Sequence, residues 1–220
     1  MTVALVAPGL RRKAVALGTP WEANQPLWVF GYGSIIYRVD FPIEAQVFGF
    51  IKGKQRAFLQ ESHDHRGTET SPGRVCTLIP AQEWNSMFVH DPTTPNINSE
   101  SRCWGMAYKV KSGMEQDVKE HLDYREKDGY AIDFVQVFDG KSEEPVLNDV
   151  MVYVGNSDNP SFAGASSVLD TAKVIAHAEG PSGTSRDYLF HLCNALREKR
   201  PDAVDPYLAN LEKIVKEIIK

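Results

Sequence analysis

Hydrophobic residues follow two different spacing patterns, one before and one after Ser166. Short apolar runs that end at turn residues predict strands over 27–31, 44–60 (broken at Gly49 and Gly53), 74–80, 102–110, 130–138 and 150–155. After Ser166 the apolar residues recur with the spacing of a helix face, which predicts helices over 167–178, 185–199 and 203–219. This order predicts an α+β fold: a small mixed β-sheet or barrel with flanking helices and a helical C-terminal third.

One helix is expected inside the strand-rich part, over residues 112–126. Ser112 is a suitable N-cap, and one face of the helix carries Met114, Val118, His121 and Leu122. The segment 81–101 shows little periodicity and contains proline turns, so it is expected to be a long surface loop. The GPSG sequence at 180–183 is expected to form a turn between two of the C-terminal helices.

The length of 220 residues suits one domain with short appendages. Residues 1–26 are expected to be a flexible N-terminal tail, which leaves 27–220 as a single domain. Residues 1–21 contain no acidic side chain and include a basic run at 11–13, so an organelle-targeting peptide is the alternative. The tail is preferred because these residues include two prolines and no serine.

Composition and charge argue against several classes of protein. A net charge of -5 and a pI near 5.7 do not suit a nucleic-acid-binding protein, which normally carries a basic patch or stripe. No apolar run approaches the roughly 20 residues needed to cross a bilayer, so no membrane partner is expected. Cys76, Cys103 and Cys193 are far apart and form no CxxC pair, which indicates buried, reduced thiols in a cytoplasmic protein.

The first expected strand runs directly into Gly31-Tyr32-Gly33-Ser34, and apolar residues resume at Ile35. The stretch lacks the third glycine of a dinucleotide fingerprint, the lysine of a phosphate-binding loop and the G-x-S-x-G context of a nucleophilic serine. Two interpretations remain: a structural bend, or a turn whose backbone N–H groups bind an anion or a polarised carbonyl. The local sequence leaves both open.

Glu126 stands at the C-terminal end of the helix expected over 112–126. The partial negative charge at a helix C-terminus disfavours an ionised carboxylate, so an acid at this position goes against local preference. Such conflicts are expected at functional sites, and a carboxyl group whose pKa is raised towards neutrality is a competent general base. The alternative interpretation is an exposed glutamate in a frayed turn.

Two histidines and two arginines near the turn-rich segment 66–73 are further candidates. On a strand, His63 and His65 would share one face, as metal ligands do, but no third ligand follows at a suitable spacing, so no metal site is expected. Arg66 and Arg74 flank the turn, and either could bind a substrate carboxylate or form a surface salt bridge. Of these two, Arg74 is included in the candidate substrate site.

Seven short segments follow one another in a recognisable order. They are VFGYGSI, DHRG, PGRV, WGMAY, REKDGY, VYVG followed by DNP, and GPSG followed by RDYL. Each is weak alone, but this series, from residue 27 to about 217, resembles the ChaC-type γ-glutamylcyclotransferases. These are the glutathione-specific members of the γ-glutamylcyclotransferase-like superfamily.

The resemblance implies that the α-amino group of a γ-glutamyl residue attacks its own side-chain carbonyl. The products are 5-oxoproline and, from glutathione, Cys-Gly, and no metal or organic cofactor takes part. The general base of the family matches Glu126. The substrate-binding loop and a second strand of the family match Val29, Phe30, Gly31, Tyr32, Gly33, Ser34, Ile35 and Tyr153.

The sequence therefore predicts a cytoplasmic glutathione-degrading enzyme, a monomer or homodimer. Its departures from the family, such as Ile35 in place of leucine and Tyr37 in place of tryptophan, leave substrate preference rather than reaction type open. Three alternatives remain. They are a cyclotransferase for other γ-glutamyl peptides or amines, a non-catalytic γ-glutamyl-binding relative, and a metal-dependent hydrolase built on His63 and His65. The presence of Glu126 argues against the second.

Overall fold

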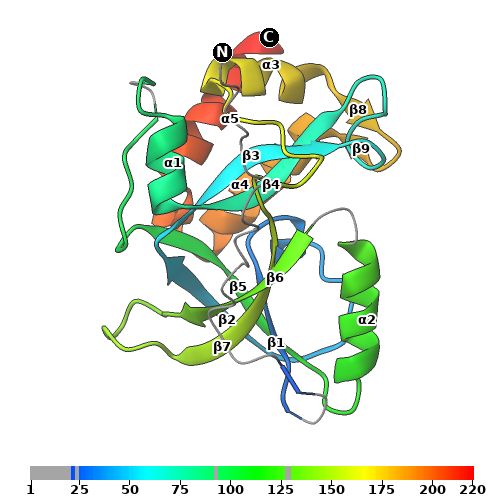
Figure 1. The fold of residues 1–220 in the computed structure, drawn as a ribbon, viewed down its shortest axis with the longest axis vertical. Helices are drawn as coiled ribbons and strands as arrows, with labels where there is room; N and C mark the ends of the chain where they lie inside the picture. The colour runs from blue at the N-terminus through cyan, green and yellow to red at the C-terminus, as the bar shows by residue number, and fades with distance from the viewer. Residues whose placement is uncertain (1–20, 23–24, 92–93, 127–129) are drawn as a thin grey trace, which may run out of the picture.

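The computed structural model describes residues 21–22, 25–91, 94–126 and 130–220, so most of the segment expected to be a tail or targeting peptide lies outside the described residues. The chain forms two halves that share one hydrophobic core (Figure 1). One half is a five-stranded sheet with a helix beside it, and the other is a two-stranded sheet with four helices around it. The helix beside the large sheet is α2 (Glu115–Arg125); the other four are α1 (Ala81–Met87), α3 (Val168–His177), α4 (Ser185–Lys199) and α5 (Pro206–Ile218).

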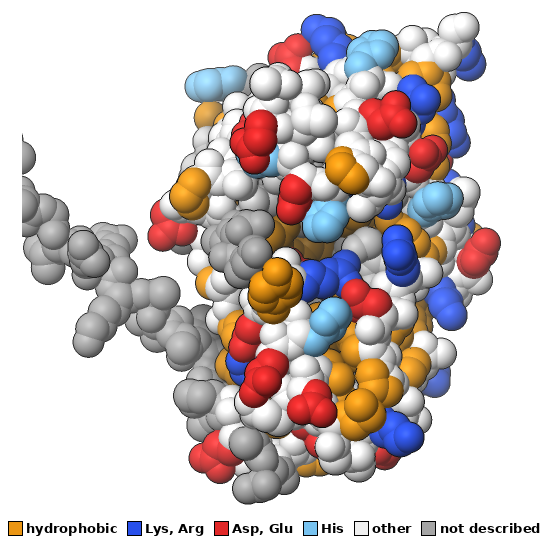
Figure 2. Space-filling view, turned by 90° about the vertical axis from the view of Figure 1, so that its right-hand side faces the viewer, with side chains coloured by type: hydrophobic (Ala, Val, Ile, Leu, Met, Phe, Trp, Pro, Cys, Tyr) orange, Lys and Arg blue, Asp and Glu red, His pale blue; other side chains and the backbone are white. Residues whose placement is uncertain are grey.

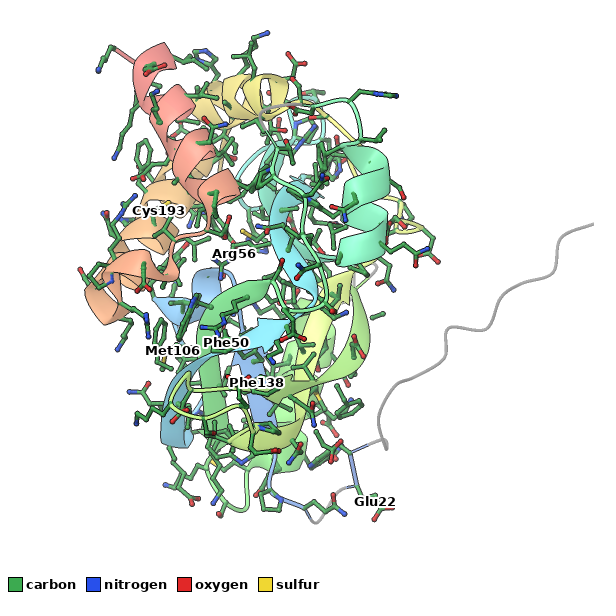
Figure 3. All side chains as sticks on the ribbon, turned by 90° about the vertical axis from the view of Figure 1, so that its left-hand side faces the viewer. Glu22, Phe50, Arg56, Met106, Phe138 and Cys193 are labelled. Atoms are coloured by element: carbon green, nitrogen blue, oxygen red, sulfur yellow. The ribbon has the colours of Figure 1, made fainter. Side chains whose placement is uncertain are left out.

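The large sheet is mixed, as predicted. Its strand order is β2-β5-β1-β7-β6, and only the central pair β1–β7 is parallel. The strands are β1 (Trp28–Gly31), β2 (Ile43–Lys52), β5 (Arg102–Val110), β6 (Tyr130–Val137) and β7 (Leu147–Gly155). The sheet curls until Phe50 and Phe138 form an isolated bridge, with N···O distances of 2.8 and 2.9 Å (Figure 3). It remains an open sheet, so the barrel alternative is wrong.

Gly49 does not break a strand, contrary to the prediction, because β2 runs through it. A Cβ atom there would lie 2.5 Å from the backbone oxygen of Phe138, so glycine is needed for the close approach of the two edges of the sheet. Gly53 does end the strand as predicted. Its φ of +70° turns the chain from β2 into β3 (Lys54–Ser62).

The segment 81–101 is not a simple surface loop, which corrects the sequence prediction. It begins with helix α1, and Trp84 on that helix is completely buried in the shared core. The Trp84 indole donates a hydrogen bond of 2.9 Å to the backbone oxygen of Pro95, which ties the following loop to the helix. The apolar positions of this segment are too few to show helical periodicity, and the helix is stabilised by tertiary packing.

The C-terminal helices lie where the apolar spacing predicts them. Each begins with a side-chain cap, supplied by Ser167, Thr184 and Asp205 in α3, α4 and α5 respectively. The GPSG segment forms the predicted turn, between the short strands β8 (Glu179–Gly180) and β9 (Gly183–Thr184). The helices cover the hairpin of β3 and β4 (Gly73–Pro80), which completes the core of this half.

Helix α2 is present but begins differently from the prediction. Ser112 does not cap it; its hydroxyl donates a hydrogen bond of 2.6 Å to Glu44, and Met114 stands at the N-cap without a side-chain hydrogen bond. Val118 and Leu122 are buried as predicted, whereas His121 is exposed and lies 3.4 Å from an oxygen of Asp40. The helix therefore packs through a narrow apolar stripe.

The cysteines and the helix lengths can also be compared with the predictions. Cys76, Cys103 and Cys193 are buried free thiols, as predicted. Among the helices of the described residues, none is both long and apolar enough to span a bilayer.

Candidate active site

The glycine loop leaves the central strand of the sheet and forms a tight turn. After β1 ends at Gly31, residues Ser34–Ile36 make a 3₁₀ turn, η1, in which the N–H of Ile36 donates to Gly33 O at 3.0 Å. The first N–H groups of such a turn have no partner within it. The N–H groups of Gly33, Ser34 and Ile35 therefore precede the first hydrogen bond of the turn.

A buried arginine fixes this loop between the two halves of the molecule. Arg56 on β3 is completely buried; its Nε donates a 2.7 Å hydrogen bond to Tyr32 O, and its Nη2 donates to Trp104 O. Its Nη1 lies 3.5 Å from Asp205 Oδ2, at the start of α5. One guanidinium therefore links the loop, the sheet and the C-terminal helix.

Glu126 lies at the C-terminal end of α2, as predicted, and next to the loop. Its backbone N–H caps the helix by donating to Leu122 O at 2.9 Å, and its side chain is 18% exposed. Arg125 connects it with the loop. The Nε of Arg125 lies 3.4 Å from Glu126 Oε1, Nη2 donates to Ser34 Oγ at 3.1 Å, and Nη1 donates to Asp40 at 2.7 Å.

Two tyrosines join the loop to α2 by a chain of hydrogen bonds. The Tyr32 hydroxyl donates to Tyr153 O at 2.8 Å, and the Tyr153 hydroxyl donates to Asp123 Oδ1 at 2.7 Å. Burial raises the pKa of both phenols, and the nearby Glu126 carboxylate raises each further. Both phenols therefore stay protonated at neutral pH and act as donors beside Glu126.

Tyr188 on α4 (Ser185–Lys199) also packs against the glycine loop. Its hydroxyl lies so close to the loop that a Cβ atom on Gly33 would be 2.5 Å away from it. Tyr37, which follows η1, meets the Tyr188 ring edge-on at 6.2 Å, and its buried hydroxyl has no hydrogen-bond partner among the described residues. Burial raises the pKa of Tyr37 to about 12, so this hydroxyl is also protonated at neutral pH.

Figure 2 looks onto the face that carries α2 and shows a hollow there. The hollow lies between the half that carries β8 and β9 and the half that carries α2. Lys or Arg, Asp or Glu, and His side chains all stand around it, over an apolar interior. A mixed rim of this kind suits a small zwitterionic ligand.

The structure brings some of the predicted site residues together and keeps others apart. Tyr32 to Ile35, Tyr153 and Glu126 surround one region, whereas the Val29 and Phe30 side chains are core residues that support the loop from behind. Among the described residues, no contact joins the Arg74 side chain to the glycine loop. Its Nη1 lies 3.2 Å from Glu61 Oε1, it is half-buried, and burial lowers its pKa.

The two histidines do not share a strand face, because β3 ends at Ser62 and residues 63–67 form bends. His63 lies 3.3 Å from Glu61, and His65 is exposed with its Nδ1 3.2 Å from Ser182 Oγ. Among the described residues, no group of three or more His, Cys, Asp or Glu side chains could hold a metal ion.

Comparisons with known proteins show to which family this arrangement belongs. The family model described as ChaC-like protein matches residues 27–218. The chain belongs to the ChaC-like family. The glutathione-specific γ-glutamylcyclotransferase of Schizosaccharomyces pombe is 40% identical over 191 residues, which cover 86% of this chain and 92% of that protein. The Saccharomyces cerevisiae protein of the same name is 34% identical and covers 87% of this chain and 97% of its own length.

Solved structures show the same relationship in three dimensions. A crystal structure of a yeast γ-glutamylcyclotransferase specific to glutathione aligns with a TM-score of 0.75 at 32% identity, covering 89% of this ChaC-like chain and all of that one. A γ-glutamyl cyclotransferase structure at 14% identity, with a TM-score of 0.50, covers 89% of this chain and 98% of its own. The second shares the fold alone.

Several residues of this ChaC-like site were not among the sequence-predicted residues. Arg125, Asp123 and Tyr188 all contact the loop or its neighbours. In the sequence, a positive charge directly beside Glu126 was the signal that could have identified Arg125 as a site residue. Asp123 and Tyr188 look like ordinary helix residues in the sequence, because only tertiary packing brings them to the loop.

Proposed function

We propose that this protein is a glutathione-specific γ-glutamylcyclotransferase, which converts glutathione into 5-oxoproline and Cys-Gly. The observation that carries the proposal is that Arg125 bridges Glu126 and Ser34, so that a carboxylate stands beside the glycine loop. The names of the S. pombe and S. cerevisiae relatives support the choice of glutathione as substrate. The presence of both the loop and Glu126 supports a catalytic rather than a purely binding role.

Glu126 acts as the general base in this proposal. The α-amino group of the γ-glutamyl residue is an ammonium near neutral pH and has no lone pair until a proton is removed. Glu126 removes that proton, and the free amine attacks the side-chain carbonyl carbon to form the five-membered ring. When the bond to the cysteine nitrogen breaks, that nitrogen takes up the proton held by Glu126. The ring nitrogen passes its second proton to the released amine, which leaves as the ammonium group of Cys-Gly.

The loop stabilises the charge that develops on the carbonyl oxygen. The N–H groups of Gly33, Ser34 and Ile35 lie at the start of η1, where fixed donors cost no reorganisation during the reaction. The hydrogen-bonded pair of Tyr32 and Tyr153 holds the loop at a fixed distance from α2. The position of the bound substrate is thereby fixed relative to the Glu126 carboxylate.

All groups assigned to the reaction lie in one chain, which suits a monomer or a homodimer. The three buried free thiols suit a reducing compartment, so we propose a cytoplasmic location. The proposed chemistry requires no metal or organic cofactor.

A comparison of Glu126→Gln with wild type tests the proposal. Wild type incubated with glutathione should release 5-oxoproline and Cys-Gly in equal amounts, and Glu126→Gln should be slower by roughly 10²- to 10⁴-fold. Glu120→Gln, on an exposed position of the same helix, is the matched control and should retain wild-type activity. Absence of both products from wild type would refute the function. An active Glu126→Gln variant would refute the assignment of the base.

A further inference from the structure

Arg66 lies near the glycine loop without forming an ion pair to any described residue, unlike three other arginines of this region. Arg74 pairs with Glu61, Arg125 pairs with Asp40, and the buried Arg56 lies beside an aspartate. Among the described residues, no carboxylate forms an ion pair with Arg66. Within the part of the chain that the structure describes, its side chain donates one hydrogen bond, from Nη1 to the backbone oxygen of Thr184 at 3.2 Å. Four of its five N–H donors therefore remain available.

The backbone of Arg66 is nevertheless held firmly. Its N–H donates to Ser62 Oγ at 2.9 Å, and its carbonyl oxygen accepts from Ser185 Oγ at 3.1 Å. Gly73 and Gly180 permit the close packing around it. A Cβ atom on Gly73 would collide with Arg66 O, and one on Gly180 would lie 2.5 Å from His65 O. The position from which the part-buried Arg66 side chain extends is therefore fixed.

The side chain of Arg66 lies over the ring of Tyr188, which packs against the glycine loop. Its guanidinium carbon is 5.7 Å from the ring centre of Tyr188, the residue whose hydroxyl contacts Gly33. The same ring carries Tyr37 on its edge, and the buried Tyr37 hydroxyl has no hydrogen-bond partner among the described residues. An arginine with N–H donors to spare therefore stands close to the glycine loop, and a guanidinium suits a carboxylate.

The two ends of glutathione can be assigned from the positions of the charged residues. The γ-glutamyl amine must lie at Glu126, so the carboxylate on the same carbon lies on the Arg125 side. The glycine carboxylate stands at the other end of the peptide, up to roughly 10 Å away for three residues in an extended conformation. Arg66 reaches the loop from the opposite half of the molecule, beside β9 and α4.

We propose that Arg66 binds the glycine carboxylate of glutathione, an inference that rests on the proposed function. It gives the enzyme a physical basis for preferring γ-glutamyl peptides that end in a carboxylate over γ-glutamylamines, which have none. Arg74, which the sequence suggested for this type of contact, remains paired with Glu61.

The test compares two substrates on each enzyme preparation: glutathione and its glycine ethyl ester, which lacks the second carboxylate charge. Wild type should use the ester with kcat/KM lower by roughly 10- to 100-fold, mainly through KM, because a charge-assisted contact is lost. With glutathione, kcat/KM of Arg66→Ala should fall below that of wild type by a similar factor. With the ester, kcat/KM of the variant should stay close to the wild-type value, so the preference for glutathione should nearly disappear. Arg66→Lys should restore part of the preference.

Arg102→Ala, an exposed arginine on β5 that lies over Phe50, is the matched control and should keep the wild-type preference. The ratio of the kcat/KM values for the two substrates does not depend on the folded fraction of a preparation. Equal losses with both substrates in Arg66→Ala, or no loss, would overturn the proposal, as would a wild type that does not distinguish them. A wild type that forms no 5-oxoproline from glutathione would instead refute the proposed function.

Discussion

Gly33→Ala is predicted to inactivate the enzyme by displacing the glycine loop. The new methyl carbon would lie 2.5 Å from the Tyr188 hydroxyl, whereas its 3.7 Å contact with Cys76 Cβ would be ordinary. The Tyr188 ring cannot move aside easily, because it is 6% exposed and packs edge-on against Phe58 and Tyr37. The loop must therefore move instead.

The size of the effect follows from the distance. Ordinary contact begins at 3.4 Å, so the loop and the hydroxyl must separate by about 0.9 Å. A misplacement of about 1 Å can reduce the rate of an enzyme roughly 100-fold, because the reacting groups no longer meet in the productive geometry. We expect kcat/KM of Gly33→Ala to fall by this factor, mostly in kcat.

A second substitution should reverse the defect if this explanation is right. Tyr188→Phe removes the hydroxyl oxygen, and the next atom of the ring, Cζ, would lie at an ordinary 3.8 Å from the new methyl carbon. The double variant Gly33→Ala/Tyr188→Phe should therefore return to within about fivefold of Tyr188→Phe alone, a strong coupling between neighbouring sites.

The assay measures kcat and KM from 5-oxoproline release for all four enzymes, with thermal unfolding followed in parallel. A double variant as inactive as Gly33→Ala would show that the hydroxyl contact is not the cause. A fully active Gly33→Ala variant would show that the loop does not need its present position.

Four further outcomes are expected. Arg56→Met leaves Asp205 and two backbone oxygens without their buried partner, so urea denaturation should show a loss of roughly 3–5 kcal/mol in the free energy of unfolding, and an unchanged midpoint would contradict this. Tyr153→Phe removes the hydrogen bond to Asp123 and should lower kcat/KM roughly 5- to 20-fold without loss of folding; full activity would exclude a positioning role. Burial alone would raise the pKa of Glu212, but hydrogen bonds from two basic side chains hold it below its ordinary value. Wild type should therefore be more stable to urea than Glu212→Gln at pH 7, and the difference should disappear as the pH falls below about 4; a difference independent of pH would contradict it. Activity should survive a strong chelator, and its loss would point to a metal.

Local sequence was sufficient for most elements of the fold. The C-terminal helices followed from apolar spacing, and their caps at Ser167, Thr184 and Asp205 lie within two residues of the predicted starts. Prediction from local sequence failed where contacts with distant segments decide the role of a residue. Gly49 looked like a strand break, but it is a contact point for Phe138, and Ser112 looked like a helix cap, but Glu44 takes its hydroxyl.

For the proposed site, the sequence by itself singled out two candidate parts, the glycine loop at 31–34 and the carboxylate of Glu126 at a helix end, and the family resemblance assigned their roles. Both depend on short-range features, namely backbone freedom at glycine and charge at a helix terminus. Only the tertiary structure decided which charged and aromatic residues meet the loop. Arg56, Tyr188 and Arg66 come from segments far apart in the chain, and contacts between such segments leave no periodic signal in the sequence.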